Sequence, residues 1–273
     1  MERRSSWPAV DHAGGGVSPQ NSTASVHTPA PDPNTVLGRS INLLDAFQAG
    51  DGTLTLAEIH ARSGIPKPTA HRLLIQLSGW GLVERHHHGY RLGLRLFELG
   101  QRVTHQHNFG LSMGPVLQQL RNRTELTVHL ALLDHTDVVY LEKLDAPGAP
   151  ATASRVGGRL PAHCTAVGKA VLAHTPSGLV RQILSNGLER RSPRTVVVPK
   201  LFLGQLESTR RNGFARDDEE CAVGISCIAA PIFDRNDQPV AALSVTARTD
   251  DTRHEHAVRA VLTAAADASR RIA

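Results

Sequence analysis

The sequence predicts an α+β protein with two ordered parts: three short helices and a hairpin, then a larger domain of helices mixed with strand pairs. Three observations support this fold class. Apolar residues recur at helical spacing over about 36–80, and two strand-like runs flank a His-rich turn just beyond. Two longer hairpin patterns follow, near 126–144 and 225–247.

The chain is long enough for two compact domains, and its basic residues outnumber its acidic ones. It has 273 residues, of which 40% are hydrophobic and 4% aromatic, so its cores depend on Leu, Val, Ile and Ala. The formal net charge of +5 suits a polyanionic partner. Three cysteines argue against a disulfide framework, and no apolar run is long enough to predict a membrane span. We expect a cytoplasmic protein with no membrane partner.

Residues 1–34 are rich in Pro, Ser, Gly, Asn and Thr, so they are predicted to be a disordered N-terminal extension. Order is expected from Val36 onward. Apolar side chains then recur at helical spacing at Leu37, Ile41, Leu44 and Phe47. Gly50 is placed for a C-terminal cap of this first helix.

A winged helix-turn-helix is predicted over residues 35–93. Thr55 and Glu58 form a capping-box pattern that opens the second helix, and Gly64 ends it. The third helix, about 68–80, has an apolar stripe at Ala70, Leu73, Leu74 and Leu77. Two short strands around a turn then form the wing.

The polar face of the third helix predicts contacts with double-stranded DNA, because its side chains are of types that bond base edges or phosphates. The wing adds positive charge near its tip. The candidate DNA-binding residues are Lys67, Thr69, His71, Arg72, Gln76, Arg85 and Arg91. The alternative is an ordinary solvated helix face. A mildly basic module is expected to bind DNA weakly as a single copy, so a homodimer on two half-sites is predicted.

After a linker helix at 94–106, residues 107–273 are predicted to form the α+β domain. On its last strand, Ser244 and Thr246 share one face, whereas Leu243 and Val245 share the other. Small hydroxyls on one face favour a ligand pocket, and they also fit a strand face exposed to solvent. The acidic run 217–220 fits a charged turn.

Residues 213–234 carry a pattern that resembles the signature of the IclR family of bacterial transcription regulators. The matching positions are Gly213, Asp217, Glu220, Cys227, Ile228, Ala229, Ile232, Phe233 and Asp234. The resemblance covers roughly residues 36–271. It implies a DNA-binding regulator whose C-terminal GAF-like α/β domain binds a small effector, either a small carboxylate or an aromatic catabolite. It also implies repression of a catabolic operon, with activation as the alternative, by a homodimer or a dimer of dimers.

The resemblance also implies which residues contact the effector. They come from the loop before Gly168, from the acidic and Cys positions of the signature, and from the last strand. Carried over to this sequence, they are Ala166, Val167, Asp217, Cys227, Ser244 and Thr246, with Ile225 as an apolar wall. The sequence departs from the family at Pro68, where a Ser is usual, and at Val167, which is bulkier than the common residue.

Two other classes of protein remain as alternatives. An enzyme would use Cys227 or Asp217 in catalysis, and the thiol would then need a base such as His129 or His163 beside it. A ligand-binding or assembly module would lack salt-dependent DNA binding. A zinc site is the remaining candidate for a metal, but its ligands have an unusual spacing, and neither a metal nor a cofactor is expected. Its ligands would be His163, Cys164, Cys221 and Cys227.

Overall fold

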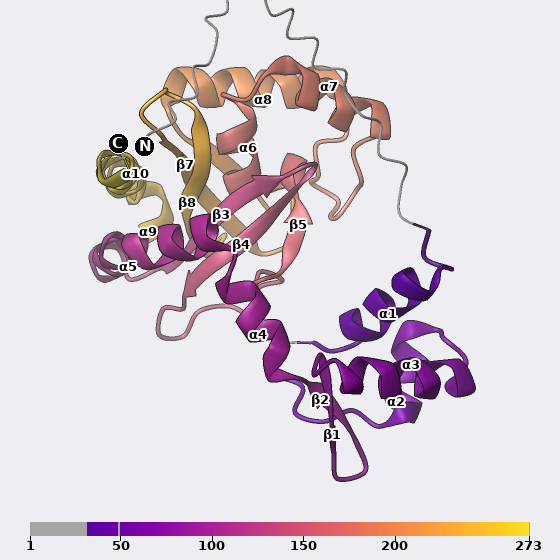
Figure 1. Ribbon diagram of the computed structural model, residues 1–273. Helices are drawn as coiled ribbons and strands as arrows, with labels where there is room; N and C mark the ends of the chain where they lie inside the picture. The colour runs from indigo at the N-terminus through magenta and orange to yellow at the C-terminus, as the bar shows by residue number, and fades with distance from the viewer. Residues whose placement is uncertain (1–31, 49, 273) are drawn as a thin grey trace, which may run out of the picture.

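The computed structural model describes residues 32–48 and 50–272, so the predicted extension at 1–34 lies almost wholly outside the described residues. Figure 1 shows a small N-terminal unit and a larger C-terminal unit joined through helix α4 (Leu94–Gln101). Within the described ranges, no helix has both the length and the apolar character that a membrane crossing requires.

The N-terminal unit is the predicted winged helix-turn-helix. Its elements are α1 (Val36–Asp45), α2 (Leu56–Ser63), α3 (Lys67–Gly79), β1 (Val83–His86) and β2 (Gly89–Leu92). The apolar stripe of α3 is buried as expected and packs against α1 and α2. Leu54 forms an antiparallel bridge with Tyr90, which adds a third short strand segment to the wing.

Local sequence signals determine most of the helix ends in this unit. The capping box at α2 is present, because the Thr55 hydroxyl accepts from the Glu58 amide and the Glu58 carboxylate accepts from the Thr55 amide. Gly64 caps the same helix with a φ of 69°. The predicted cap at Gly50 is wrong, since α1 ends at Asp45. The chain turns inward there because Ala46 is buried against the core.

The linker is not one helix over 94–106. Helix α4 ends at Gln101, and α5 (Thr104–Thr124) begins three residues later. The break has a local cause: the amides of Arg102 and Val103 bond back to Leu99 and Gly100 in tight turns, and Val103 has a ψ of 71°, outside the helical region.

The C-terminal unit is built on one antiparallel sheet in the order β5-β4-β3-β8-β7-β6. Its strands are β3 (Thr127–Asp134), β4 (Asp137–Leu144), β5 (Arg159–Pro161), β6 (Ala215–Asp218), β7 (Ile225–Phe233) and β8 (Pro239–Arg248). Its helices are the 3-10 turn η1 (Ala162–Cys164), then α6 (Ala166–Leu172), α7 (Ser177–Asn186), α8 (Pro199–Asn212), α9 (Arg253–His256) and α10 (Val258–Ile272). Part of the acidic run, expected in a turn, lies on the edge strand β6.

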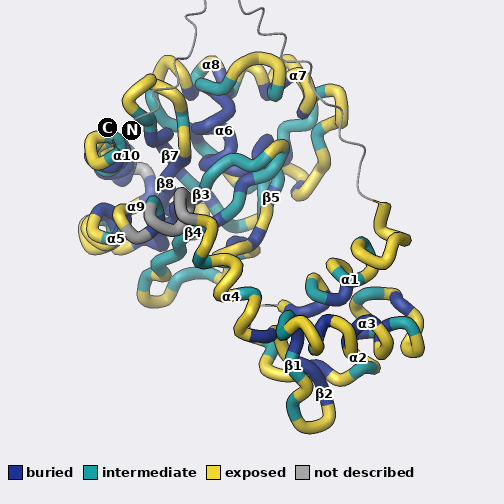
Figure 2. Tube along the Cα trace, in the orientation of Figure 1, coloured by how far each residue is buried: buried dark blue, intermediate teal, exposed yellow. Residues whose placement is uncertain are grey.

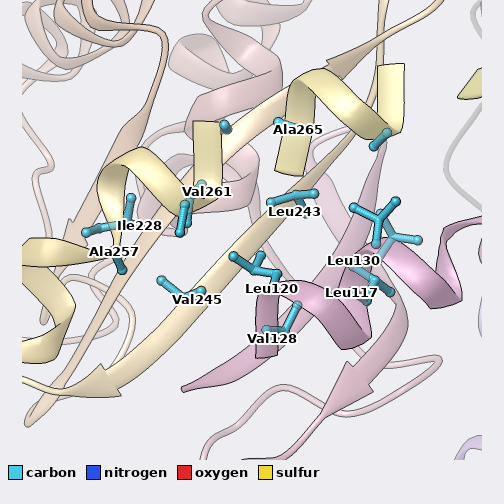
Figure 3. Packing of buried hydrophobic residues seen from close by; sticks show 14 of the residues in the cluster. Leu117, Leu120, Val128, Leu130, Ile228, Leu243, Val245, Ala257, Val261 and Ala265 are labelled. Carbon is cyan, nitrogen blue, oxygen red and sulfur yellow. The ribbon is translucent and has the colours of Figure 1, made fainter. Parts of the chain in front are cut away.

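Each face of this sheet is covered by helices, so the domain has two separate cores. Helices α5 and α10 cover one face, where Leu120, Leu243, Val245 and Val261 pack together (Figure 3). Helix α6 covers the other face and is itself backed by α8. Figure 2 shows that α6 is buried along its length. A buried helix with polar strand positions beneath it is a setting for an enclosed pocket.

Candidate functional site

Helix α3 presents the predicted polar face to solvent. Lys67, His71, Arg72 and Gln76 are exposed, and Thr69 is half-buried. The helix is held from behind by its buried apolar stripe, so its outward face keeps a fixed orientation. The structure therefore leaves these side chains available for contacts with a duplex.

The two predicted wing residues differ in their surroundings. Arg85 is exposed on β1. Arg91 on β2 donates to the Glu84 carboxylate across the hairpin, with Nη2 2.6 Å from Oε2. This exposed ion pair offsets the charge of Arg91, so the wing offers less positive charge than the sequence suggests. His87 occupies the tip of the hairpin with a φ of 50°.

A pocket lies between α6 and the sheet, and all seven predicted effector residues line it. Strand register explains why residues far apart in sequence meet here. Thr246 on β8 pairs with Cys227 on β7, which pairs with Asp217 on β6. Cross-strand partners point to the same face of a sheet, so a hydroxyl, a thiol and a carboxyl lie in one row. Ser244 lies two residues before Thr246 on the same face of β8, opposite Ala229.

Other residues complete the pocket, and the sequence did not single them out as lining. They are His129, Tyr140, Thr152, Ala153, Ser154, Leu160, Thr165, Cys221 and Ala222. Most come from β3, β4 and the segment after β4. A His within an otherwise apolar strand was the available signal, because a buried ring needs polar partners nearby.

His129 is the centre of a buried hydrogen-bond chain. Its Nε2 lies 2.8 Å from the Ser154 hydroxyl, which lies 2.8 Å from the Thr152 hydroxyl. Its Nδ1 lies 3.4 Å from the Thr246 hydroxyl, and this hydroxyl lies 3.1 Å from the Cys227 sulfur. Burial lowers the pKa of His129 to about 4, so the ring is neutral at pH 7. The chain thus presents neutral polar groups to a ligand.

Asp217 is the acidic group of the pocket. Its Oδ1 accepts from the amides of Glu220, at 2.7 Å, and Cys221, at 3.2 Å. Burial raises the pKa of this carboxyl to about 7, against the opposing charge of Lys169 and these two amides. Asp217 therefore holds a proton in a substantial fraction of molecules near neutral pH.

Asp217→Asn is expected to change the pH dependence of stability. The pKa of Asp217 is raised on folding from its usual 3.8 to about 7, so its stabilising contribution is complete below pH 3.8 and is lost as pH rises through 7. The amide cannot titrate, so the variant is expected to gain roughly 2 kcal/mol relative to wild type between pH 5 and pH 8. Urea unfolding at both pH values measures this difference. Asp218→Asn, at the exposed neighbouring residue, is the control, and a constant offset in Asp217→Asn would refute the assignment.

Among the described residues, the geometry matches neither the hypothesis of an enzyme that uses Cys227 nor the hypothesis of a zinc site. Burial raises the pKa of the Cys227 thiol, and Thr246 lies between it and His129, so the predicted histidine base does not contact the thiol directly. His163 bonds instead to the carbonyl of Glu189, 2.9 Å away. Across the described residues, no group of three or more His, Cys, Asp and Glu side chains is arranged to hold a metal.

Comparison with known proteins agrees with this architecture. The family described as "Bacterial transcriptional regulator IclR C-terminal" matches residues 101–273, and "IclR helix-turn-helix domain" matches residues 36–87. The chain belongs to the IclR family of bacterial transcriptional regulators. It is a DNA-binding regulator with an effector-binding C-terminal domain, and not an enzyme.

Curated relatives in this family cover most of the chain. The transcriptional regulator KdgR of Escherichia coli K12 is 35% identical over 217 residues, which are 77% of this chain and 82% of that protein. The regulator XynR of the same strain is 32% identical over 219 residues, which are 78% of this chain and 87% of that protein. The transcriptional repressor IclR, also from this strain, is 31% identical over 77% of this chain and 78% of its own length.

Solved structures of the family share the whole fold. An IclR homolog from Microbacterium hydrocarbonoxydans, complexed with 4-hydroxybenzoate, has a TM-score of 0.78 and 29% identity, over 87% of this chain and 99% of that one. The IclR protein of Thermotoga maritima has a TM-score of 0.71 and 29% identity, over 86% of this chain and 98% of that one.

Proposed function

We propose that this IclR-family regulator represses a catabolic operon by binding an operator, and that a small aromatic catabolite in the α6 pocket changes its operator affinity. The observation that carries this proposal is the pocket itself, which is lined by apolar side chains together with the buried hydroxyls of Ser154, Ser244 and Thr246. The same architecture also allows the opposite direction of regulation, in which the protein activates transcription of the operon. An operator partner also implies that the protein acts in the cytoplasm.

In this proposal, residues 35–93 bind DNA, residues 94–106 link the units and residues 107–273 bind the effector. Lys67, Thr69, His71, Arg72 and Gln76 contact the duplex from α3, and Arg85 and Arg91 contact it from the wing. The exposure of α3 supports base contacts, because its first turns expose the polar side chains of Lys67, His71 and Arg72.

Homodimerisation, alone or as a dimer of dimers, is part of the proposal. Helix α1 exposes Leu37 and Ile41, and helix α4 exposes Leu94 and Phe97. Leu37 is 72% and Phe97 62% exposed, which is unusual for such apolar side chains in one small unit. A second copy that covers these helices would bring two α3 helices onto adjacent half-sites. Sedimentation equilibrium is expected to give twice the mass of the chain or a multiple of that.

The pocket lining supports a hydroxylated aromatic effector rather than a small aliphatic acid. Among the described residues that line the pocket there is no Lys or Arg, and the acidic side chain that lines it, Asp217, is buried. A ligand carboxylate facing Asp217 would meet like charge in the molecules where Asp217 is ionised, whereas a ligand hydroxyl can donate to it, so the hydroxyl of a hydroxybenzoate would face Asp217 and its carboxylate would point away. Val167, Ile225 and Leu160 supply apolar contact for a ring. The IclR homolog complexed with 4-hydroxybenzoate supports the same ligand class.

Calorimetric titration tests the effector class. We expect 4-hydroxybenzoate to bind, and benzoate, which lacks the donor hydroxyl, to bind about tenfold more weakly, since an unpaired buried acceptor costs 1–3 kcal/mol. Acetate is the small aliphatic comparison. Binding of acetate as tightly as 4-hydroxybenzoate would remove the aromatic assignment while leaving the pocket in place.

Regulation then follows from a shift between two spacings of the DNA-binding units. An effector alters operator affinity only by its differential affinity for the two arrangements. The test is fluorescence anisotropy on DNA upstream of its own gene against random duplex, over a salt series with and without ligand. Binding that is selective, salt-sensitive and changed by ligand supports the proposal, whereas equal binding to both duplexes counts against it.

Arg72→Ala is expected to lower operator selectivity. Arg72 is exposed on the polar face of α3, and a bidentate contact between arginine and guanine contributes about 1–3 kcal/mol of discrimination. Affinity for the operator should fall by this amount while affinity for random duplex changes little. Arg123→Ala, at an exposed arginine of α5, is the matched control. Equal losses on both duplexes would assign Arg72 to phosphate contact instead.

A further inference from the structure

The hydrogen-bond chain around His129 crosses the pocket from one side to the other. It begins at Thr152 and Ser154, in the segment that follows β4. It then passes through His129 on β3 and ends at Thr246 on β8 and Cys227 on β7. All five side chains line the pocket. Since β3, β8, β7 and β6 are neighbours in this order, one end of the chain lies beside the edge strand β6 and the other lies beyond β3.

Every side chain in this chain has one hydrogen to share. A hydroxyl or a thiol carries one hydrogen, and a neutral imidazole carries one N–H and one bare nitrogen that accepts. Within the described part of the protein, these five side chains hydrogen-bond only to one another. All the hydrogens can therefore point toward Thr152, or all can point toward Cys227. Any other arrangement leaves one contact with two hydrogens or with none.

The ring of His129 determines which of the two directions the chain takes. If Nε2 carries the hydrogen, the ring donates to Ser154, and Thr152 has a hydrogen free for a ligand. If Nδ1 carries the hydrogen, the ring donates to Thr246, and the free hydrogen is that of the Cys227 thiol. Burial lowers the pKa of His129 to about 4, so only one of its two nitrogens carries a hydrogen at pH 7.

We propose that His129 is a positioning residue for the effector: it sets the direction of the chain, so that an acceptor on the ligand beside Thr152 and a donor beside Asp217 are selected together. The inference rests on the proposed binding of a hydroxylated aromatic acid in this pocket. A ligand carboxylate only accepts, so it favours the direction in which Thr152 donates to it. In that direction the Cys227 thiol donates to Thr246, away from its cross-strand partner Asp217, which is left to the ligand hydroxyl.

Nitrogen-15 NMR of the histidine rings tests whether the two hydroxyls beside the ring set its tautomer, with no ligand present. The full-length protein is labelled at histidine and studied at pH 7, and the His129 signals are those that disappear in His129→Gln. Ser154→Ala removes the partner of Nε2, so the hydrogen should lie on Nδ1, because an orphaned buried N–H is rarer than an orphaned acceptor. Thr246→Val removes the partner of Nδ1 and should give the opposite tautomer.

The same tautomer in both variants would overturn the inference, because the ring would then not respond to its hydroxyl partners. Thr246→Ala takes the place of Thr246→Val if that variant does not fold.

Addition of ligand to the labelled wild-type protein tests the coupling across the pocket. With 4-hydroxybenzoate at saturation, the hydrogen of His129 should lie on Nε2. Phenol lacks the carboxylate, so the share of this tautomer should be smaller in its complex. Hydrogen on Nδ1 or on both nitrogens in the 4-hydroxybenzoate complex, or equal shares with the two ligands, would count against the inference.

Affinities of matched variants separate the hydrogen-bonding role of the ring from its shape. The amide of His129→Gln keeps one donor group and one acceptor group, whereas His129→Phe keeps neither. We expect His129→Phe to bind 4-hydroxybenzoate about tenfold more weakly than wild type and to lose the preference over phenol, and His129→Gln to recover part of both. His174→Phe, at a histidine that does not line the pocket, should bind as wild type does. Equal affinities of His129→Gln and His129→Phe would mean that the ring supplies shape alone.

The proposed function can fail separately from this inference. If calorimetry shows no binding of 4-hydroxybenzoate, the proposed effector class is wrong, whereas opposite tautomers in Ser154→Ala and Thr246→Val would still show that His129 directs the chain. If these two variants share one tautomer, the inference fails whichever ligand the pocket binds.

Discussion

Replacing Lys169 by methionine is expected to lower the unfolding free energy by about 3–5 kcal/mol, the cost of leaving one member of a buried ion pair alone. Lys169 is 1% exposed in the middle of α6, and its ammonium donates to the Glu220 carboxylate, which is also buried. The same carboxylate oxygen accepts from the Gln205 amide at 2.9 Å. Without the ammonium, Glu220 must either remain charged in an apolar core or take up a proton.

Two further variants make this prediction specific to the pair. Lys200→Met, at an exposed lysine of α8, should change stability by less than about 0.5 kcal/mol. The double variant Lys169→Met with Glu220→Gln should recover much of the loss, because it removes both charges. Urea unfolding of the four proteins at pH 7 gives these values. A single Lys169→Met variant within 1 kcal/mol of wild type would mean that the pair carries no buried charge.

The helices and the longer hairpins could be predicted because their signals are local. The capping box at Thr55 and the apolar stripe of α3 are confirmed, as is the division of β8 into a face with Ser244 and Thr246 and a face with Leu243 and Val245. Each of these depends on residues within a few positions of one another, where helix and strand periods are unambiguous.

What the sequence did not reveal depends on contacts between distant segments. Strands β5 and β6 are only three and four residues long and gain their partners from the sheet, so no periodicity marks them. His129 lines the pocket because β3 pairs with β8, which places it opposite Ser244. The seven residues inferred from the family resemblance do line one pocket, but their contact with an effector stays a prediction.

The burial of the charged side chain of Lys169 could not be predicted from the local sequence either. A lysine beside a glycine and an alanine fits an exposed helix position, since Lys is rarely fully buried. Its actual place is explained by Glu220, 51 residues later, which meets it in the interior. The glycine beside it has a similar role, because it permits α6 to approach the preceding segment more closely than a side chain would allow.

Gly168→Ala is therefore the second change with a large expected effect, about 3 kcal/mol or more of lost unfolding free energy. A Cβ at this position would lie 2.6 Å from the carbonyl carbon of Ala162 and closer still to its oxygen and Cα. These are backbone atoms of η1, so α6 or η1 must move, and a side-chain rotation cannot relieve the overlap. The displaced helix carries Ala166 and Val167, so the pocket wall should move with it.

Gly204→Ala is the matched control, because Gly204 is exposed inside α8 and a Cβ there meets nothing within 4 Å. Alanine favours a helix interior over glycine, so this variant should gain roughly 0.5–1 kcal/mol. Opposite signs for the same substitution in two helices would separate the close approach of α6 to η1 from helix propensity. If Gly168→Ala also proved neutral or stabilising, the contact between α6 and η1 could not be as tight as the structure has it, and the position assigned to Val167 in the pocket wall would be wrong as well.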